Sequence, residues 1–261
     1  MDLYAGIDVG SGYTKALVLD GAGAVRGRGL THSGADFVAA AERARDEALA
    51  SAGAAPDAIA ACVATGYGRT NVVFADARRT EIDCHARGAF HHFPQAITVV
   101  DIGGQDNKVI RVDAAGRRID FTMNRKCAAG TGSFLEEIAY WLKIPLDDFS
   151  DLADRSTDSS VTLGSYCTVF AKTEILARVR EGARPEDLAR AAIESVARRV
   201  LESRLITGTV VLTGGVVAHV PRLRQTLADV LHTPVEVPPD PQHTGALGAA
   251  LVARTLNSDA G

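Results

Sequence analysis

Two segments of this sequence match each other, and this repetition restricts the possible fold more than any other feature. The first reads DVGSGYTKALVLDGAG from Asp8, and the second reads DIGGQDNKVIRVDAAG from Asp101, an offset of 93 residues. The polar and glycine positions that coincide are Asp8 with Asp101, Gly10 with Gly103, Lys15 with Lys108, Asp20 with Asp113, and Gly23 with Gly116. Self-similarity at a fixed offset indicates a duplicated structural unit. We therefore expect the same supersecondary structure twice.

Each copy has the pattern of a three-stranded meander. An apolar run (LYAGID or ITVVDI) leads into a Gly-containing turn, a second strand follows (KALVLD or KVIRVD), and a Gly-bearing turn precedes a third (VRGRGL or RIDFTM). AIAACVAT and VVLTGG are typical of further strands. Helical spacing is found over Asp36 to Ala52 and in GTGSFLEEIAYWLK, LDDFSDLA, PEDLARAAIESVARRVLESRL, HVPRLRQTLADVL and TGALGAALVARTL, with Pro185 well placed at a helix start.

These patterns predict an α/β protein of two duplicated lobes, each a mixed sheet flanked by helices. We expect residues 1–95 to form the first lobe, with the first hairpin, and residues 96–246 to form the second lobe, with the second hairpin. Residues 247–261 are expected to form a C-terminal helix that packs back on the first lobe. No low-complexity linker separates the lobes, so they should share a cleft.

Composition excludes several classes of partner. Hydrophobic residues make up 46% of the chain and charged residues 23%, which is ordinary for a globular protein. A net charge of -4, a pI near 6.0 and the lack of a long Lys/Arg block argue against nucleic acid or a membrane surface as partner. The N-terminus lacks the pattern of a signal peptide, and no apolar run is long enough to span a bilayer. We expect a cytoplasmic protein.

The two hairpin turns have the composition of a phosphate site. Glycine lets backbone N–H groups approach an anion closely, because no side chain blocks them. The turn residues are Gly10, Ser11 and Gly12 in the first copy and Gly103 and Gly104 in the second. One such turn is weak evidence, since Gly-rich hairpin turns are common. Two turns at a fixed offset, each behind an Asp at a strand end, predict that phosphates lie between the hairpins.

Carboxylates beside these turns suit a divalent cation. Asp8 and Asp101 are expected to face each other across the cleft, where hard oxygen ligands can hold Mg²⁺ mostly through its waters. Gln105 or Asp106 is placed to orient water for attack on the terminal phosphate. The candidate catalytic residues are therefore Asp8, Asp101, Gln105 and Asp106. A third glycine pair, Gly214 and Gly215, ends a strand and could admit the nucleoside. Neither a GxxxxGK[ST] loop nor a GxGxxG fingerprint follows a strand.

Two of the four cysteines stand in polar, Gly-containing surroundings before expected helices. Cys127 lies in NRKCAAGTGSFL and Cys167 in GSYCTVFAKTEILARV, and a helix N-terminus favours a thiolate. Cys62 lies inside an apolar strand and Cys84 in a helix-like stretch, so both are expected to be inert. A lone cysteine is more often a small core residue, but this pair favours metal ligation. A cubane iron-sulfur cluster needs four thiolates, which two chains related by a two-fold axis would supply.

The order DVGSGYTK, DIGGQDNK, LTGGV and TGALGAAL resembles the phosphate-one, phosphate-two, adenosine and second connecting motifs of the superfamily that contains actin, sugar kinases and heat-shock chaperone ATPases. The resemblance covers nearly the whole chain. It implies the actin and sugar-kinase fold with ATP or ADP in the cleft between the lobes, and it places Gln242 near the adenosine pocket. The candidate nucleotide contacts are Gly10, Ser11, Gly12, Tyr13, Thr14, Lys15, Gly103, Gly104, Gly130, Thr131, Gly132, Gly214, Gly215 and Gln242.

The strings NRKCAAGTG and YCTVFAKTE, together with the nucleotide motifs, resemble the activator ATPases of 2-hydroxyacyl-CoA dehydratases and the ATPase subunits of benzoyl-CoA reductases. This resemblance implies a [4Fe-4S] cluster held between two subunits by Cys127 and Cys167, in a homodimer or a heterodimer with a related subunit. ATP hydrolysis would accompany transfer of one electron to a partner iron-sulfur enzyme that acts on a CoA thioester, with ferredoxin or flavodoxin as donor. Tyr166 and Lys172 depart from the dehydratase activators, so the subfamily stays open.

Two other functions share this fold, since a fold alone does not fix a function. A small-molecule (sugar) kinase would need a base for a sugar hydroxyl and would have no use for two cysteines at helix starts. A non-catalytic nucleotide sensor or filament protein would assemble with ATP and bind no iron. Tyr140 and Trp141, at the end of an expected helix, are interpreted as core residues.

Overall fold

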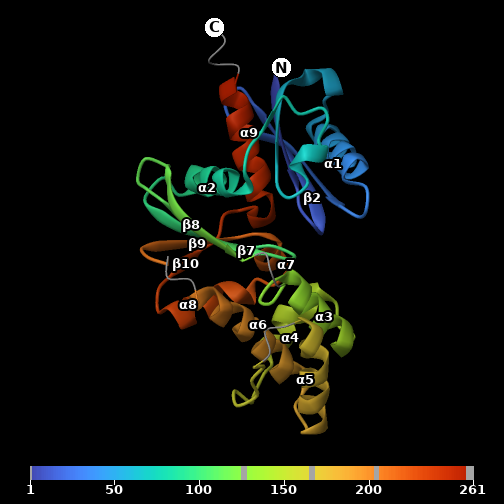
Figure 1. Cartoon of the computed structure of the whole chain (residues 1–261), viewed down its shortest axis with the longest axis vertical. Helices are drawn as coiled ribbons and strands as arrows, with labels where there is room; N and C mark the ends of the chain where they lie inside the picture. Colours follow the sequence, from blue (N-terminus) through green and yellow to red (C-terminus); the bar gives the residue numbers. More distant parts are fainter. Residues whose placement is uncertain (1, 125–127, 165–167, 203–205, 257–261) are drawn as a thin grey trace. The chain divides into compact units, whose positions relative to one another are not determined.

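The computed structural model describes residues 2–124, 128–164, 168–202 and 206–256 of the chain (Figure 1). The chain divides into two compact units. Unit 1 comprises Met1–Gln95, Val112–Arg118 and Gln242–Gly261, and unit 2 comprises Ala96–Arg111 and Ile119–Pro241.

The two units contain five-stranded sheets with the same strand order. Read from the third strand of each meander, the orders are β3-β2-β1-β4-β5 and β8-β7-β6-β9-β10. The strands of the first sheet are β1 (Leu3–Val9), β2 (Tyr13–Asp20), β3 (Val25–His32), β4 (Ile59–Thr65) and β5 (Ala77–Arg78). Those of the second are β6 (Ile97–Ile102), β7 (Asn107–Val112), β8 (Arg118–Asn124), β9 (Thr209–Thr213) and β10 (Val235–Glu236). In both sheets the first strand of the meander runs parallel to the strand on its other side, β4 or β9. The duplicated meanders predicted from sequence are confirmed.

The hydrogen bonds that close the turns are repeated at the same offset. A backbone N–H to carbonyl bond closes the first turn of each hairpin, from Gly10 to Tyr13 at 3.1 Å and from Gly103 to Asp106 at 2.9 Å. In the second turns, the Asp20 carboxylate accepts from the N–H groups of Ala22 and Ala24, and the Asp113 carboxylate accepts from those of Ala115 and Arg117. The shared sequence letters therefore specify shared turn geometry.

Helices flank each sheet, most of them at places that the sequence predicts; the short helix at Gly215–His219 is one that it does not predict. Unit 1 contains α1 (Phe37–Ala52), α2 (Glu81–His92) and α9 (Thr244–Leu256), with short 3₁₀ turns at Pro56–Ala58 and Arg69–Asn71; a further turn, Pro241–His243, leads into α9. Unit 2 contains α3 (Gly132–Leu142), α4 (Phe149–Asp154), α5 (Thr168–Arg180), α6 (Pro185–Leu201), α7 (Gly215–His219), α8 (Arg222–Leu231) and a 3₁₀ turn at Leu146–Asp148. Individual residues favour the starts of two helices. The Asp36 side chain accepts from the Ala39 N–H at the start of α1, and Pro185 is the first residue of α6.

Unit 1 packs its helices on the sheet through small residues. Helix α1 lies against β2 and β3, and α9 lies against β1, β4 and α2 (Figure 1). A Cβ atom at Gly6 of β1 would lie 2.0 Å from the carbonyl oxygen of Ala246 in α9. A Cβ atom at Gly248 of α9 would lie 1.8 Å from the carbonyl oxygen of Cys84 in α2. The helices therefore approach backbone to backbone, at distances that side chains would prevent.

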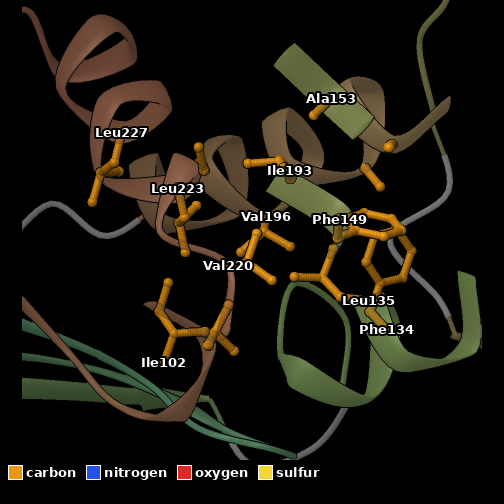
Figure 2. Close-up of a cluster of buried hydrophobic side chains, with 14 of the residues drawn as sticks. Ile102, Phe134, Leu135, Phe149, Ala153, Ile193, Val196, Val220, Leu223 and Leu227 are labelled. Atoms are coloured by element: carbon orange, nitrogen blue, oxygen red, sulfur yellow. The ribbon is translucent and has the colours of Figure 1, made fainter. Parts of the chain in front are cut away.

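Unit 2 has a core of large side chains instead. Figure 2 shows Phe134 and Leu135 of α3 converging with Phe149 of α4 and Ile193 of α6, and all four are fully or almost fully buried. Residues of β6, β7, β9, β10, α5, α7 and α8 also belong to this cluster. Burial of aromatic and branched side chains at near-crystalline density supplies most of the favourable free energy of such a core.

The interpretation of Tyr140 as a core residue is wrong. Its side chain is 72% exposed, because it lies on the solvent side of α3, opposite to Phe134 and Leu135. The neighbouring Trp141 is partly buried: its indole N–H donates to Glu137 at 2.7 Å, and the Lys172 ammonium lies 4.0 Å from the ring centroid. Within the described ranges, no helix combines the length and hydropathy needed to cross a membrane.

Candidate functional site

The first hairpin holds a buried carboxylate at the end of β1. Asp8 is 4% exposed, and its Oδ2 lies 3.6 Å from Nζ of Lys15, the residue opposite it in the antiparallel ladder with β2. Two glycines pack closely against it: a Cβ atom at Gly66 would lie 2.4 Å from Oδ1, and one at Gly245 would lie 2.9 Å from Oδ2. A side chain at either position would therefore collide with the Asp8 carboxylate.

A hydroxyl network holds the first turn. Ser33 donates from Oγ to the Gly10 carbonyl at 2.7 Å, and its Oγ lies 2.9 Å from Oγ1 of Thr14. Thr14 is fully buried, and the Tyr13 ring lies 4.3 Å from the His32 ring between centroids. Side chains therefore brace this turn, in addition to the backbone hydrogen bond from Gly10 to Tyr13 that closes it.

The second hairpin repeats the arrangement with tighter pairing. Asp101, at the end of β6, is 2% exposed, and its Oδ2 accepts from Lys108 Nζ at 2.9 Å. The same ammonium donates to Asp106 Oδ1 at 2.8 Å. Thr213 Oγ1 donates to the other Asp101 oxygen at 3.0 Å, and a Cβ atom at Gly214 would lie 2.9 Å from it. In both hairpins, a lysine and a glycine thus lie beside the carboxylate of the Asp that ends the first strand.

Gln105 and Asp106, the two residues proposed to orient water, differ in how accessible their side chains are. The Asp106 carboxylate is paired with Lys108, and its Oδ1 lies where a Cβ atom at Gly103 would be 2.8 Å away, so it folds back over the turn. Gln105, at the tip of the same turn, is exposed. Gln105 is therefore the more accessible of the two candidates.

The start of α3 is attached to the second turn. The N–H groups of Gly132 and Ser133 donate to the carbonyls of Gly103 and Gly104 at 2.9 and 2.8 Å. The Thr131 hydroxyl donates to the Gly104 carbonyl at 2.9 Å. Gly130, just before, lies against the Arg199 side chain, whose Cβ would be 2.7 Å from a Cβ atom placed at Gly130. Residues 131–133 therefore link the helix to the second turn, whereas Gly130 packs against α6.

Cys127 and Cys167, the predicted cluster ligands, lie outside the described residues. Helix α5 begins at Thr168, directly after Cys167. At the start of α3, the N–H groups of Gly132 and Ser133 donate to the second turn. In the part of the chain that the structure describes, no group of three or more His, Cys, Asp or Glu residues is arranged to hold a metal ion.

The other two cysteines have the character of core residues. Cys62 lies in β4 and Cys84 in α2, both buried. Burial raises the pKa of each thiol to about 12, with smaller effects from neighbouring charges. At neutral pH both stay protonated and unreactive, as their apolar surroundings predict.

The glycine pair expected near the nucleoside lies between β9 and α7. Gly214 directly follows β9 and donates its N–H to the Pro241 carbonyl at 2.9 Å, and Gly215 is the first residue of α7. Gln242 is 8% exposed and belongs to unit 1, whereas the glycine pair belongs to unit 2.

Sequence reasoning did not assign several residues that surround the two carboxylates. Thr65 and Thr213 end β4 and β9 and pair in register with Asp8 and Asp101. A Thr-Gly dipeptide follows an apolar strand in both places, so the string ATG in the first half and LTG in the second was a usable signal. Lys108 was visible in the repeat, but its contact with two carboxylates depends on the fold of the turn.

Comparison with known proteins places this chain in a family. The model of the BadF/BadG/BcrA/BcrD ATPase family matches residues 5–253. The activator of lactoyl-CoA dehydratase from Anaerotignum propionicum is 43% identical over 256 residues, which cover 95% of this chain and 96% of that protein. One of the subunits of benzoyl-CoA reductase from Thauera aromatica is 29% identical, over 96% of this chain and 93% of that protein.

Solved structures agree with this placement. The activator of the 2-hydroxyisocaproyl-CoA dehydratase from Clostridium difficile, with bound ADPNP, superposes with a TM-score of 0.92 at 34% identity, covering 99% of this chain and 96% of that one. A ROK family glucokinase from Streptomyces griseus superposes at 0.61 with 14% identity over 97% of this chain and 99% of that one, which supports the sugar-kinase-like fold alone. With the family model matching most of its length, the chain belongs to the BadF/BadG/BcrA/BcrD ATPase family.

Proposed function

We propose that this protein is an ATP-dependent reductive activator, which passes one electron to a partner iron-sulfur enzyme acting on a CoA thioester. The observation that carries the proposal is family membership together with 43% identity to a protein named activator of lactoyl-CoA dehydratase. A partner of the 2-hydroxyacyl-CoA dehydratase class is favoured over one of the benzoyl-CoA reductase class, because identity to the named reductase polypeptide is lower, at 29%.

Both hairpins take part in ATP binding and hydrolysis in this proposal. Mg²⁺ would be held by Asp8 and Asp101 through its waters, which fits the hard oxygen ligands that their carboxylates provide. Backbone N–H groups of the two turns bind the phosphates, apart from those of Gly10 and Gly103, which close the turns. Gln105 orients the attacking water, since phosphoryl transfer depends on positioning and charge neutralisation more than on covalent help.

The attachment of α3 to the second turn supports coupling between hydrolysis and electron transfer. A turn that binds ATP and ADP differently changes its preferred position, and a ligand shifts such an equilibrium by its difference in affinity. Because Gly132 and Ser133 donate hydrogen bonds to the turn carbonyls, the start of α3 follows that change. The sequence places Cys127 four residues before Thr131, the residue that precedes this helix.

Cys127 and Cys167 from each of two chains are the proposed ligands of a shared [4Fe-4S] cluster, in a homodimer or with a related subunit. The cluster supplies a low-potential electron, which ferredoxin or flavodoxin provides to it. We propose a cytoplasmic protein. The sugar-kinase alternative is less favoured, because the resemblance to the glucokinase, at 14% identity, supports the fold alone.

Hydrolysis is tested by neutralising each carboxylate. Asp8→Asn and Asp101→Asn are each expected to lower the Mg²⁺-dependent ATPase rate at least about a hundredfold, because charge-stabilising groups of this kind contribute that much to turnover. Asp57→Asn removes a charge from an exposed residue of unit 1 and serves as the matched control. Wild-type rates in both site variants would show that the proposed site is wrong.

Electron delivery is tested with a partner enzyme. An anaerobic assay with a 2-hydroxyacyl-CoA dehydratase, dithionite-reduced donor, ATP and this protein should show dehydration only when all components are present. About two iron atoms per chain are expected, with loss of iron in Cys127→Ala and Cys167→Ala and retention in Cys62→Ala and Cys84→Ala. Phosphoryl transfer to a sugar faster than basal hydrolysis, without bound iron, would assign the protein to the kinases instead.

A further inference from the structure

Lys108 is a buried cation held between two carboxylates. Its side chain is 3% exposed, and Nζ lies 2.9 Å from Asp101 Oδ2 and 2.8 Å from Asp106 Oδ1. Asp101 comes from the end of β6, and Asp106 comes from the turn before β7. A charge with so little solvent is stable only when it is paired, and here one ammonium pairs with carboxylates on both sides of the turn.

The first hairpin lacks this arrangement although it has the same fold. Its lysine, Lys15, lies 3.6 Å from Asp8 Oδ2 and keeps 15% exposure of its side chain. The residue at the position of Asp106 is Tyr13, by the offset of the repeat. The first hairpin therefore sets one carboxylate beside its lysine, and the second sets two.

Two carboxylates converging on one small cation are also the ligand arrangement that a divalent ion prefers. Hard carboxylate oxygens bind Mg²⁺ and Mn²⁺ directly when they are close together and uncompensated. With Lys108 charged, the three side chains carry a net charge of -1; without it, the two carboxylates would carry -2. The ammonium therefore occupies the place of a metal ion and halves the net negative charge that would attract one.

We infer that Lys108 is the resident cation of the second hairpin, a positioning residue that keeps Asp101 and Asp106 from binding a divalent ion before the nucleotide arrives. Mg²⁺ then joins this hairpin only with the phosphates that accompany it, and the two carboxylates stay fixed in the nucleotide-free protein. The inference rests on the proposed function in one respect, namely that the ligand of the hairpin is a magnesium nucleotide.

The test is binding of Mn²⁺ to the full-length, nucleotide-free protein, with free Mn²⁺ measured by its EPR signal. Lys108→Met and Lys108→Gln are expected to bind Mn²⁺ at least about tenfold more tightly than wild type, because unit charges a few ångströms apart interact by more than that factor near a protein surface. Lys108→Gln retains hydrogen-bond donors for both carboxylates, so it keeps the test available if the methionine variant does not fold. Lys108→Arg retains the charge and should bind Mn²⁺ as weakly as wild type.

Matched variants separate this role from general damage. Lys15→Met should create no Mn²⁺ site, because Asp8 has no second carboxylate at the Tyr13 position. Adding Asp106→Asn to Lys108→Met should remove the new site. The inference is overturned if nucleotide-free wild type binds Mn²⁺ as tightly as the Lys108 variants, or if the double variant binds it equally well. ATP turnover is not needed for any of these measurements, so failure of the proposed activator function would be seen separately, in the dehydratase assay.

Discussion

The two units share a strand order and a pair of hairpin turns, but they attach helices to the sheet in different ways. In unit 1, helices approach the sheet and each other at glycines, as at Gly6 beside Ala246 and at Gly248 beside Cys84. In unit 2, Phe134, Phe149 and other large side chains fill the space between sheet and helices (Figure 2). The duplicated part of the fold is therefore the sheet with its turns, and the helical layers differ.

This difference indicates what each unit tolerates. A core of large side chains loses stability when a side chain is shortened, because a cavity remains. A backbone contact at glycine loses stability when a single methyl group is added, because the opposing carbonyl cannot move away cheaply. The two units therefore present similar Asp and Lys pairs, but unit 2 is sensitive to the loss of side-chain volume and unit 1 to its addition.

The largest effect is expected from Phe134→Ala in unit 2. Phe134 is fully buried in the large core, and removal of a buried aromatic side chain costs about 3–5 kcal/mol in the free energy of unfolding. Urea unfolding followed by far-UV circular dichroism measures it. Tyr140→Ala, on the exposed side of the same helix, is the control, with an expected cost below about 1 kcal/mol. Equal costs for the two variants would contradict the placement of the core.

In unit 1, the corresponding test adds a group instead of removing one. Gly248→Ala is expected to cost about 3 kcal/mol, because the new Cβ atom would lie 1.8 Å from the Cys84 carbonyl oxygen. Alanine raises helix propensity by about 1 kcal/mol, so a measured loss must come from the contact. Gly21→Ala, where a Cβ atom would meet no atom within 4 Å, is the matched control. A neutral Gly248→Ala variant would show that α2 and α9 can separate without cost.

Much of the architecture could be predicted because the signals are local. Apolar alternation, Gly-containing turns and helical spacing act within a few residues, so the two meanders, the start of α1 next to Asp36 and the start of α6 at Pro185 followed from sequence. The two-residue strands β5 and β10 carry no such signal, since each pairs with only two residues of its neighbour. Tyr140 was misjudged because an aromatic side chain at a helix end does not reveal which side of the helix is buried.

The candidate site was predictable in its carboxylates and turns, and less so in the groups around them. Asp8 and Asp101 could be found because the repeat places each of them at a strand end. Thr213 lies 112 residues from the carboxylate that it contacts, so only the parallel pairing of β6 and β9 brings them together. The double pairing of Lys108 depends on how the turn folds back, which local patterns do not encode.

Unit 2 also contains a loop held by one buried carboxylate. Asp187 accepts from Ser156 Oγ at 2.7 Å and from the N–H groups of Thr157 and Asp158 at 3.0 Å each, and these hydrogen bonds hold its pKa below the usual value. Asp187→Asn is expected to cost about 1–3 kcal/mol at pH 7, because buried donors lose an ionised acceptor. Asp151→Asn, at an exposed position, is the control.

The same carboxylate predicts a dependence on pH. A lowered pKa in the folded state stabilises the protein above the pKa of the unfolded chain, about 4, and this contribution is lost as pH falls through the folded-state pKa. The difference in unfolding free energy between wild type and Asp187→Asn should therefore be largest near neutral pH and shrink in acid. Urea titrations at several pH values measure it. A difference that grows as pH falls would contradict the assigned hydrogen bonds.

The smallest effect concerns the second turns of the two hairpins, where the copies are most alike. Gly23 and Gly116 both have a left-handed backbone, with φ of 88° and 78°, so alanine at either position is expected to cost about 1–2 kcal/mol. A Cβ atom at Gly116 would also lie 2.9 Å from the Phe90 ring, whereas one at Gly23 would meet the tip of the flexible Arg254 side chain. Gly116→Ala should therefore cost slightly more than Gly23→Ala in urea unfolding. Asparagine, which tolerates the left-handed region, should recover part of the loss at Gly23. If Gly23→Ala proved as harmless as Gly21→Ala, the two turns would not share the geometry that their sequence repeat specifies.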